Sequence, residues 1–203
     1  MNDQEGNGRK PVIKFGTDGW RGVIAREFTF DNVARVALAT AKFLLDEKRK
    51  RLGIYKDWGS DYRPAASGVV IGYDMRFLSR EFAEHFACIL HDSGIPVTIA
   101  CEPVSTPAVS FSVVDRSAAA GIMFTASHNP PLYNGIKYKA EYSGSAPSEV
   151  TSSIEELLQD DIPVPRTLVE EIPKADLKGP FLKGIRKLID PARLTASPVK
   201  VAA

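Results

Sequence analysis

The sequence predicts an α/β fold: a three-layer α/β/α domain whose sheet is mixed but mainly parallel. Short apolar runs at 69–73, 97–101 and 118–124 have the length and composition of buried strands. Segments with helical spacing of apolar residues, at 79–93 and 107–114, separate these runs. Strands and helices that alternate at this interval favour parallel pairing, with the helices on the faces of the sheet.

The N-terminal region is rich in glycine. Residues 1–11 are mostly polar, and we expect them to form a disordered tail. The run VIKF at 12–15 is a candidate strand. The stretch GTDGWRG at 16–22 has three glycines in seven residues, which predicts a loop.

A long helix is expected next, from about residue 32 to residue 48, with Asp31 as its cap. The basic cluster KRKR at 48–51 suits the C-terminal end of this helix, where cations interact favourably with the macrodipole. Residues 53–67 have the composition of a surface loop. The apolar positions that predict the helix are Val33, Val36, Ala37, Ala41 and Leu44.

The middle of the chain contains clear helix boundaries. Ser79 is the expected cap of the 79–93 helix, Gly94 ends that helix, and Pro96 prevents it from resuming. After the 118–124 run, NGIKYKA at 134–140 predicts a strand next to it, and 148–158 predicts a further helix.

The C-terminal region has a different composition. Four prolines fall within 159–180, which predicts a linker, and a helix is expected at 181–189. The run PVKVAA at 198–203 is typical of the start of a buried strand. We therefore expect one domain over 12–160, followed over 161–203 by a linker and the truncated start of a second domain.

Composition excludes several classes of protein. With 26 basic and 25 acidic residues, the chain lacks the basic surface of a nucleic-acid binder. It has neither a signal peptide nor an apolar run of ~18 residues, so no membrane association is expected and a cytoplasmic protein is the simplest inference. Cys88 and Cys101 each lie in an apolar run, which predicts buried free thiols.

The stretch TASHNPP at 125–131 is the first candidate for chemistry, because it begins where the 118–124 strand ends. Ser127 is either a nucleophile, a phosphate carrier or a turn serine. The G-x-S-x-G elbow of serine hydrolases is absent, and His128 is poorly placed to act as a base for its neighbour. His85 and His91 have no metal-ligand spacing and are interpreted as structural.

Two further stretches carry candidate residues. Gly16, Gly19 and Gly22 allow the backbone to approach a ligand closely, and Arg21 offers a planar fork of donors suited to phosphate. The alternative is a tight loop with a surface arginine. Lys137 lies between an isoleucine and a tyrosine; it is either a proton-transfer residue or a lysine on the polar side of a strand.

Five motifs in order resemble the α-D-phosphohexomutases, with phosphoglucomutase/phosphomannomutase as the nearest type. The resemblance covers about residues 12–160, and its most specific part is TASHNP followed by NGIK. It implies the domain I fold of that family, and Trp20 favours the glucose/mannose branch. The motifs are FGTDGWRG, GYDMR, PVSTPA, TASHNPP and YNGIK.

The resemblance also implies a mechanism. Ser127 matches the family's phosphoserine, which gives its phosphoryl group to a hexose monophosphate and regains one from the hexose bisphosphate intermediate. His128 and Asn129 match the serine loop, Lys137 matches a proton-transfer lysine, and Arg21 matches an arginine near the phosphoserine.

Further expectations follow from the resemblance. Thr17 and Gly19, with Asn129, are expected to bind substrate phosphate. Mg²⁺ is the expected cofactor, held by Ser127 through its phosphate, with most ligands in a second domain that this chain lacks. The remaining three domains of the same polypeptide are expected as partners, and the 203-residue chain alone is expected to be inactive. The alternative is a non-catalytic, truncated remnant of the family that binds or regulates a partner.

Overall fold

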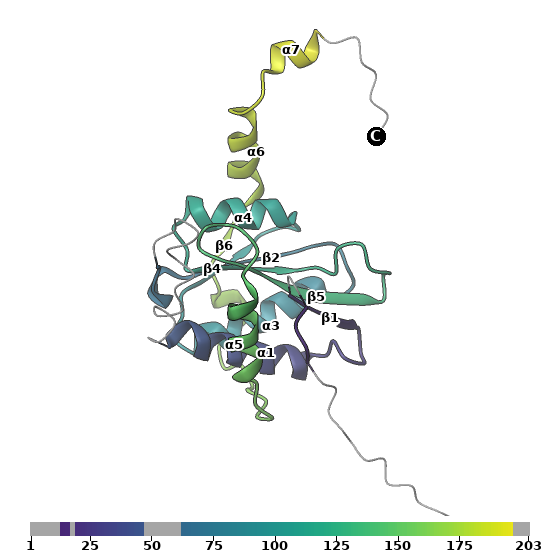
Figure 1. The fold of residues 1–203 in the computed structure, drawn as a ribbon, viewed down its shortest axis with the longest axis vertical. Helices are drawn as coiled ribbons and strands as arrows, with labels where there is room; N and C mark the ends of the chain where they lie inside the picture. Colours follow the sequence, from purple (N-terminus) through teal and green to yellow (C-terminus); the bar gives the residue numbers. More distant parts are fainter. Residues whose placement is uncertain (1–12, 17–18, 47–61, 197–203) are drawn as a thin grey trace, which may run out of the picture.

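The computed structural model describes residues 13–16, 19–46 and 62–196, which fold around one six-stranded mixed sheet (Figure 1). Helices α1, α3 and α5 cover one face of the sheet, and α4 covers the other (Figure 1). The elements are β1 (Gly19–Val23), α1 (Phe30–Leu45), η2 (Ala65–Ser67), β2 (Val69–Tyr73), α3 (Ser79–Asp92), β3 (Val97–Ala100), α4 (Thr106–Asp115), β4 (Ala120–Phe124), β5 (Tyr133–Lys139), α5 (Ser148–Glu156), η3 (Val169–Glu171), β6 (Lys174–Ala175), α6 (Lys178–Arg186) and α7 (Pro191–Thr195).

The strand order is β1-β5-β4-β2-β3-β6. The β4–β2, β2–β3 and β3–β6 pairs are parallel, whereas β1–β5 and β5–β4 are antiparallel. The predicted three-layer α/β/α class with a mainly parallel, mixed sheet is therefore confirmed. In this topology the carboxyl ends of β2, β3 and β4 share one edge of the sheet, where ligands gather in open α/β folds.

The sheet is buried on both faces, for a different reason on each. On the α4 face, a Cβ on Gly72 or Gly121 would lie within 2.4–2.6 Å of a valine methyl of α4, so the absence of side chains there lets the helix pack closely. On the opposite face, two edge-on aromatic pairs fill the core: Phe28 packs against Phe82 of α3, and Phe86 of α3 packs against Phe124 of β4.

The first strand lies later in the sequence than predicted. Ile13–Phe15 are not part of a strand, and β1 begins at Gly19, inside the stretch expected to be a loop. The physical reason is that β5 offers a strand edge: all five residues of β1 pair with it, and Trp20 is buried against Phe28 with ring centroids 4.7 Å apart.

Helix caps differ from expectation in two places. Thr29, rather than Asp31, caps α1 by accepting the Asn32 N–H at 3.2 Å. The residue before α3 is Leu78, in the left-handed region, and the side chain of Ser79 is bonded elsewhere. The expected basic end of the first helix and most of the 53–67 loop lie outside the described residues.

The C-terminal region contains more structure than a linker. Residues 174–175 form β6, which extends the sheet beside β3, and α6 begins at Lys178. Cys101 is exposed, because β3 ends at Ala100, whereas Cys88 is buried as predicted. Within the described ranges, no helix is long and apolar enough to cross a bilayer. The strand expected at 198–203 lies outside those ranges.

Candidate active site: the serine loop

Residues 125–132, here called the serine loop, connect β4 to β5 at the carboxyl edge of the sheet. Ser127 is exposed at its tip, and its φ of +57° places it in the left-handed region that non-glycine residues rarely adopt. The buried Thr125 shapes this turn, since its Oγ1 accepts the Ser127 N–H at 3.0 Å. The Thr125 N–H in turn donates to the Gly135 carbonyl of β5 at 2.9 Å. The hydroxyl is therefore presented to solvent from a backbone that the sheet holds.

Arg21 and Asn129, predicted from separate motifs, meet in the structure. An Arg21 terminal nitrogen donates to the Asn129 side-chain oxygen at 2.7 Å. In the β1–β5 register Arg21 is opposite Gly135 and Gly19 is opposite Lys137. Directly paired residues share a face of the sheet, so Arg21 is on the same face as Gly135. Residues two apart on one strand also share a face, so Lys137 projects from that face as well. Two cationic side chains thus come from β1 and β5, the strands next to the serine loop.

Gly19 has a structural reason to be glycine. Its φ is +147°, and a Cβ there would lie 2.0 Å from the Ile136 carbonyl oxygen of β5. Only a residue without a side chain lets β1 pair at this distance, which sets the position of Arg21 two residues later. The predicted contact of Gly19 with phosphate stays a prediction.

The remaining predicted residues lie in several places. His128 is exposed in the serine loop, and among the described residues no hydrogen bond joins it to Ser127. Lys137 is half-buried on β5, between β1 and β4. Thr17 lies outside the described residues.

The two other histidines lie on α3 and have structural partners. His85 packs edge-on against Phe30, and burial lowers its pKa while Asp31 acts in the opposite direction. His91 contacts the Thr167 hydroxyl at 3.1 Å. Both histidines thus contact other side chains of the protein, which fits their interpretation as structural residues.

Arg76 is a residue of the site that sequence reasoning did not single out. It follows β2, and its guanidinium donates to backbone carbonyls of the serine loop and of Tyr133 at 2.7–3.0 Å. The signal available in the sequence was the motif GYDMR, which places an arginine at the same sheet edge as Ser127.

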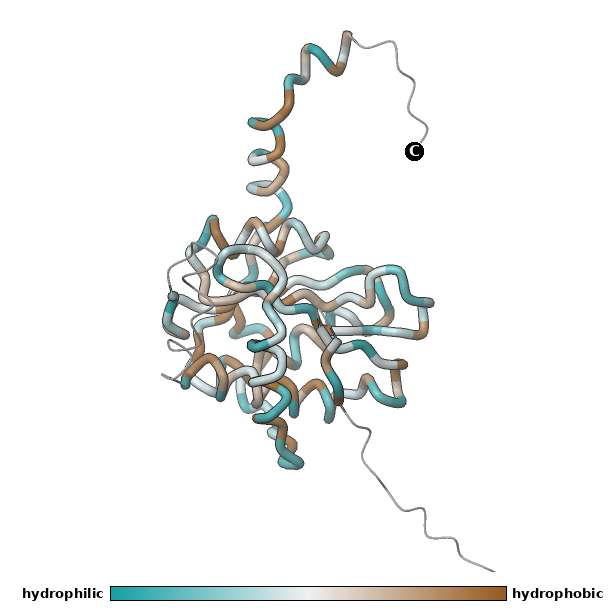
Figure 2. Tube along the Cα trace, in the orientation of Figure 1, coloured by the Kyte–Doolittle hydropathy of each residue, from teal (hydrophilic) through white to brown (hydrophobic). Residues whose placement is uncertain are grey.

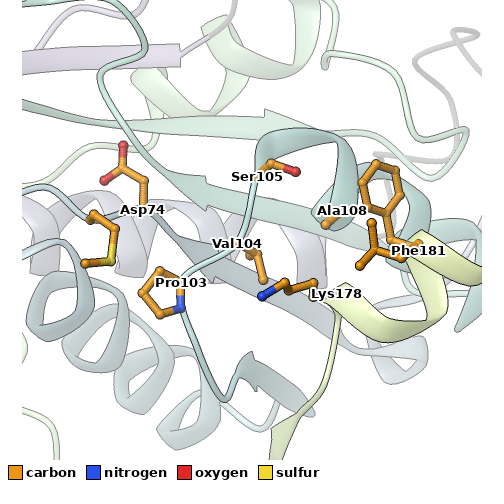
Figure 3. A pocket seen from close by; sticks show the side chains of 9 residues that line it. Asp74, Pro103, Val104, Ser105, Ala108, Lys178 and Phe181 are labelled. Carbon is orange, nitrogen blue, oxygen red and sulfur yellow. The ribbon is translucent and has the colours of Figure 1, made fainter. Parts of the chain in front are cut away.

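Two hollows adjoin the loop that contains Asp74 and Met75. The hollow beside Ser127 has a volume of about 590 Å³ and also exposes Met75 and Phe77. The second, of about 420 Å³, lies between the loop after β3 and the start of α6, where Lys178 extends toward Pro103 and Phe181 lies beside Ala108 (Figure 3). Of these two hollows, the first contains Ser127, so it is the candidate substrate site. Its lining comprises Asp74, Met75, Arg76, Phe77, Ser127, Asn129 and Pro131.

The described residues do not contain a self-sufficient metal centre. Among them, no three His, Cys, Asp or Glu side chains converge on one point. Oxygen ligands suit Mg²⁺, which is commonly bound by one or two carboxylates together with phosphate oxygens. A phosphorylated Ser127 would offer phosphate oxygens of this kind.

Comparison with known proteins agrees with this architecture. Residues 58–163 match the family model described as phosphoglucomutase/phosphomannomutase, alpha/beta/alpha domain I. The chain belongs to the phosphoglucomutase/phosphomannomutase family. It is 34% identical over 160 residues to a phosphoglucomutase of Staphylococcus saprophyticus, covering 77% of this chain and 26% of that protein. It is 32% identical over 202 residues to a phosphoglucomutase of Staphylococcus aureus, covering 92% and 33%.

Solved structures confirm the fold. A Thermus thermophilus protein assigned as a phosphomannomutase superposes with a TM-score of 0.77 at 34% identity, over 92% of this chain and 38% of that one. The pp63/parafusin phosphoglucomutase of Paramecium superposes with a TM-score of 0.66 at 19% identity, over 88% and 36%, which is a likeness of fold alone. The chain spans about a third of the length of the relatives it matches.

Proposed function

We propose that the protein containing this chain interconverts hexose 1-phosphate and hexose 6-phosphate, of glucose or mannose, and that Ser127 is its phosphate carrier. The observation that carries the proposal is the presentation of Ser127. Its hydroxyl is exposed at the carboxyl edge of the sheet, in a loop joined to Arg21 through Asn129 at 2.7 Å.

In the proposed transfer, one P–O bond breaks as another forms, and one proton moves between the two oxygens. The P–O bond to Ser127 breaks while a P–O bond to a sugar hydroxyl forms, and the proton of that hydroxyl is passed through Lys137 toward the Ser127 oxygen. A hexose bisphosphate results, turns in the site, and returns its other phosphoryl group by the reverse steps. Phosphoryl transfer depends mostly on positioning and on stabilisation of negative charge. Arg21 supplies positive charge throughout, and Lys137 adds to it from the same face of the sheet once it has accepted the proton.

Magnesium would supply further charge stabilisation when bound. In this chain we assign only the phosphate oxygens of Ser127 to it, because hard oxygen ligands suit this ion and the described residues contain no cluster of three carboxylates. The other ligands, and the groups that read the sugar, are proposed to lie in the part of the relatives' length that this chain does not span.

Serine hydrolase chemistry is disfavoured by the local geometry. The nucleophile elbow of α/β-hydrolases is a strand–turn–helix, whereas Ser127 lies in a strand–loop–strand connection between β4 and β5. The exposed His128, without a hydrogen bond to Ser127 in the described structure, gives no support for a hydrolase base.

The test uses the intact protein and glucose 1,6-bisphosphate as phosphoryl donor. We expect intact mass and peptide mapping to find one phosphate on Ser127, which is lost on addition of a hexose monophosphate. Ser127→Ala should lose the phosphate and slow isomerisation at least about 10³-fold. Ser105→Ala, which alters another exposed serine at the same edge, is the matched control and should retain both. Full activity of Ser127→Ala would refute the proposal.

For the 203-residue chain alone we propose negligible turnover. A coupled assay of glucose 1-phosphate isomerisation measures this directly. Substantial magnesium-dependent activity of the chain would contradict it. A chain that is inactive in every context, including as part of the longer protein, would instead support the non-catalytic alternative.

A further inference from the structure

We propose that Arg76 is a positioning residue that holds the serine loop in the conformation needed for phosphoryl transfer. This inference rests on the proposed function of Ser127. Arg76 acts on Ser127 through the backbone and does not itself bind a phosphate.

The donors of Arg76 are all directed at the protein. One terminal nitrogen donates to the carbonyls of Pro130 and Tyr133, each at 3.0 Å. The other donates to the carbonyls of Ser127 and Asn129, at 2.7 and 2.8 Å. The Nε atom lies 3.4 Å from an Asp74 carboxylate oxygen. A guanidinium has five N–H donors. In Arg76 four of them are bonded to backbone carbonyls, and the fifth, on Nε, faces the Asp74 carboxylate.

The four carbonyls converge on one cation, three from the irregular serine loop and one from Tyr133, the first residue of β5. Carbonyl oxygens that point at one another repel, so this curvature is stable only with a planar donor between them. One of the four belongs to Ser127 itself. Arg76 therefore orients the peptide plane that follows Ser127, while Thr125 orients the one that precedes it. Together they fix the direction of the Ser127 side chain.

Arg76 is itself anchored to the rigid part of the domain. One Asp74 oxygen accepts the Arg76 N–H at 3.0 Å and the Ser79 hydroxyl at 2.9 Å, and Ser79 is fully buried at the start of α3. The fully buried Asn134 of β5 also donates to the Phe77 carbonyl at 3.3 Å. The arginine side chain is only 15% exposed. The loop is thus attached to β2, α3 and β5 through one partly buried network.

The proposal predicts a slower transfer without loss of the fold. In the intact protein, Arg76→Ala should reduce the single-turnover rate of Ser127 phosphorylation by glucose 1,6-bisphosphate about 10²-fold, because a small misplacement of a reacting group costs that much. The KM for hexose monophosphate should change little, since Arg76 has no donor for substrate. Guanidinium ion at non-denaturing concentration should restore part of the rate. Arg76→Lys retains the positive charge but lacks the planar guanidinium with its several donors, so phosphorylation of Ser127 should remain slow.

Arg80→Ala is the matched control. Arg80 is an exposed arginine of α3 that pairs with Glu84 at 2.9 Å, on the helix rather than on the serine loop. The variant should be phosphorylated at the wild-type rate and show no response to guanidinium. If Arg76→Ala fails to fold, Arg76→Lys with the amide chemical shifts of Ser127 and Asn129 gives the same test: shifted loop amides with a slow transfer support the proposal.

The outcomes separate this inference from the proposed function. Transfer in Arg76→Ala or Arg76→Lys at the Arg80→Ala rate would overturn the positioning role while leaving Ser127 as the carrier. A slow Arg76→Ala that guanidinium does not restore, with unshifted loop amides, would also overturn it. Absence of phosphate on Ser127 in the wild-type protein would instead refute the proposed function.

Discussion

The serine loop and the C-terminal helices α6 and α7 differ in two properties: how regular their backbone is, and how extensively they contact the rest of the domain. The loop has irregular backbone, yet the side chains of Arg21 and Arg76 bond to it from outside and that of Thr125 from within. The helices are regular, but α6 contains no buried residue and the described side chains of α7 are all exposed. Hydrophobic and hydrophilic residues alternate along them (Figure 2). Their attachment includes a Phe111–Phe181 ring contact at 6.0 Å and a Lys178–Glu102 ion pair at 3.5 Å. Contacts between residues far apart in the sequence, more than local helical hydrogen bonds, therefore decide how firmly a segment is attached to the domain.

The largest difference should appear between alanine at Gly19, in the strand whose Arg21 bonds to the serine loop, and alanine at Gly184 of α6. In Gly19→Ala the new Cβ meets the Ile136 carbonyl oxygen at 2.0 Å, and its nearest neighbours are all β5 backbone atoms that cannot rotate away. We therefore expect a loss of about 3 kcal/mol or more in unfolding free energy. In Gly184→Ala of α6 the neighbour is the Phe111 ring at 2.7 Å, which can rotate, and alanine favours helix. We expect a change within about 1 kcal/mol of zero.

Urea unfolding of the two variants measures this contrast. The isolated 203-residue chain is sufficient for it, because both glycines lie in the described structure. A Gly19→Ala variant as stable as the wild type would show that β1 is attached to β5 less rigidly than its register suggests.

A smaller difference should follow from removing one local hydrogen bond in each region. Thr125→Val leaves the Ser127 N–H without its acceptor at a partly buried turn, which should cost about 1–2 kcal/mol and slow Ser127 phosphorylation about tenfold. Asp190→Ala removes the acceptor of the Ala192 and Arg193 N–H groups at the start of α7. It should fray α7 locally without moving the global unfolding midpoint.

Circular dichroism for α7, the urea midpoint and single-turnover phosphorylation distinguish these effects. Equal losses of global stability in Thr125→Val and Asp190→Ala would mean that both regions unfold as one unit, contrary to the comparison.

The smallest effect concerns the link between α3 and the segment that leads to the C-terminal helices. Burial disfavours the charged form of Asp92, but hydrogen bonds from the Thr167 hydroxyl and from the Arg166 and Thr167 N–H groups outweigh it and lower the Asp92 pKa. A lowered carboxyl pKa stabilises the folded form above the ordinary value near 3.8, and this contribution is lost as pH falls through the lower folded value.

We therefore expect residues 166–167 to exchange their amide protons faster below about pH 4 than the pH dependence of free amides explains. Asp92→Asn should remove most of this additional pH dependence, with little effect on β2 or β4. An unchanged profile in Asp92→Asn would contradict the link.

Much of the site could be predicted from the sequence because its parts are local. The strand VVIGY was predicted with its observed bounds, and β4 was expected within two residues of where it starts. Ser127 follows β4 closely, so the topology alone places it at the edge where ligands gather. The family resemblance, carried by short motifs, is confirmed by the family model.

Other parts could not be predicted because their partners are far apart in the chain. The glycine-rich stretch around Gly19 has the composition of a loop, and it becomes a strand only because β5 pairs with it. β6 has only two residues and gives no periodic signal. Arg76 contacts carbonyls 51–57 residues away, at positions that any residue type can occupy.

The order of hydrophobic and polar residues along this chain was enough to determine its alternating strands and helices, its layered α/β class and the strand end that carries Ser127. The spacing of apolar residues within one segment shows which face of that helix or strand is buried, and it needs no information from distant parts of the chain. The three-dimensional structure alone decided that β1 pairs with β5, that Arg21 meets Asn129, and that Arg76 gathers the carbonyls of the serine loop. Backbone hydrogen bonds do not depend on side-chain identity, so their distant partners leave no pattern in the sequence.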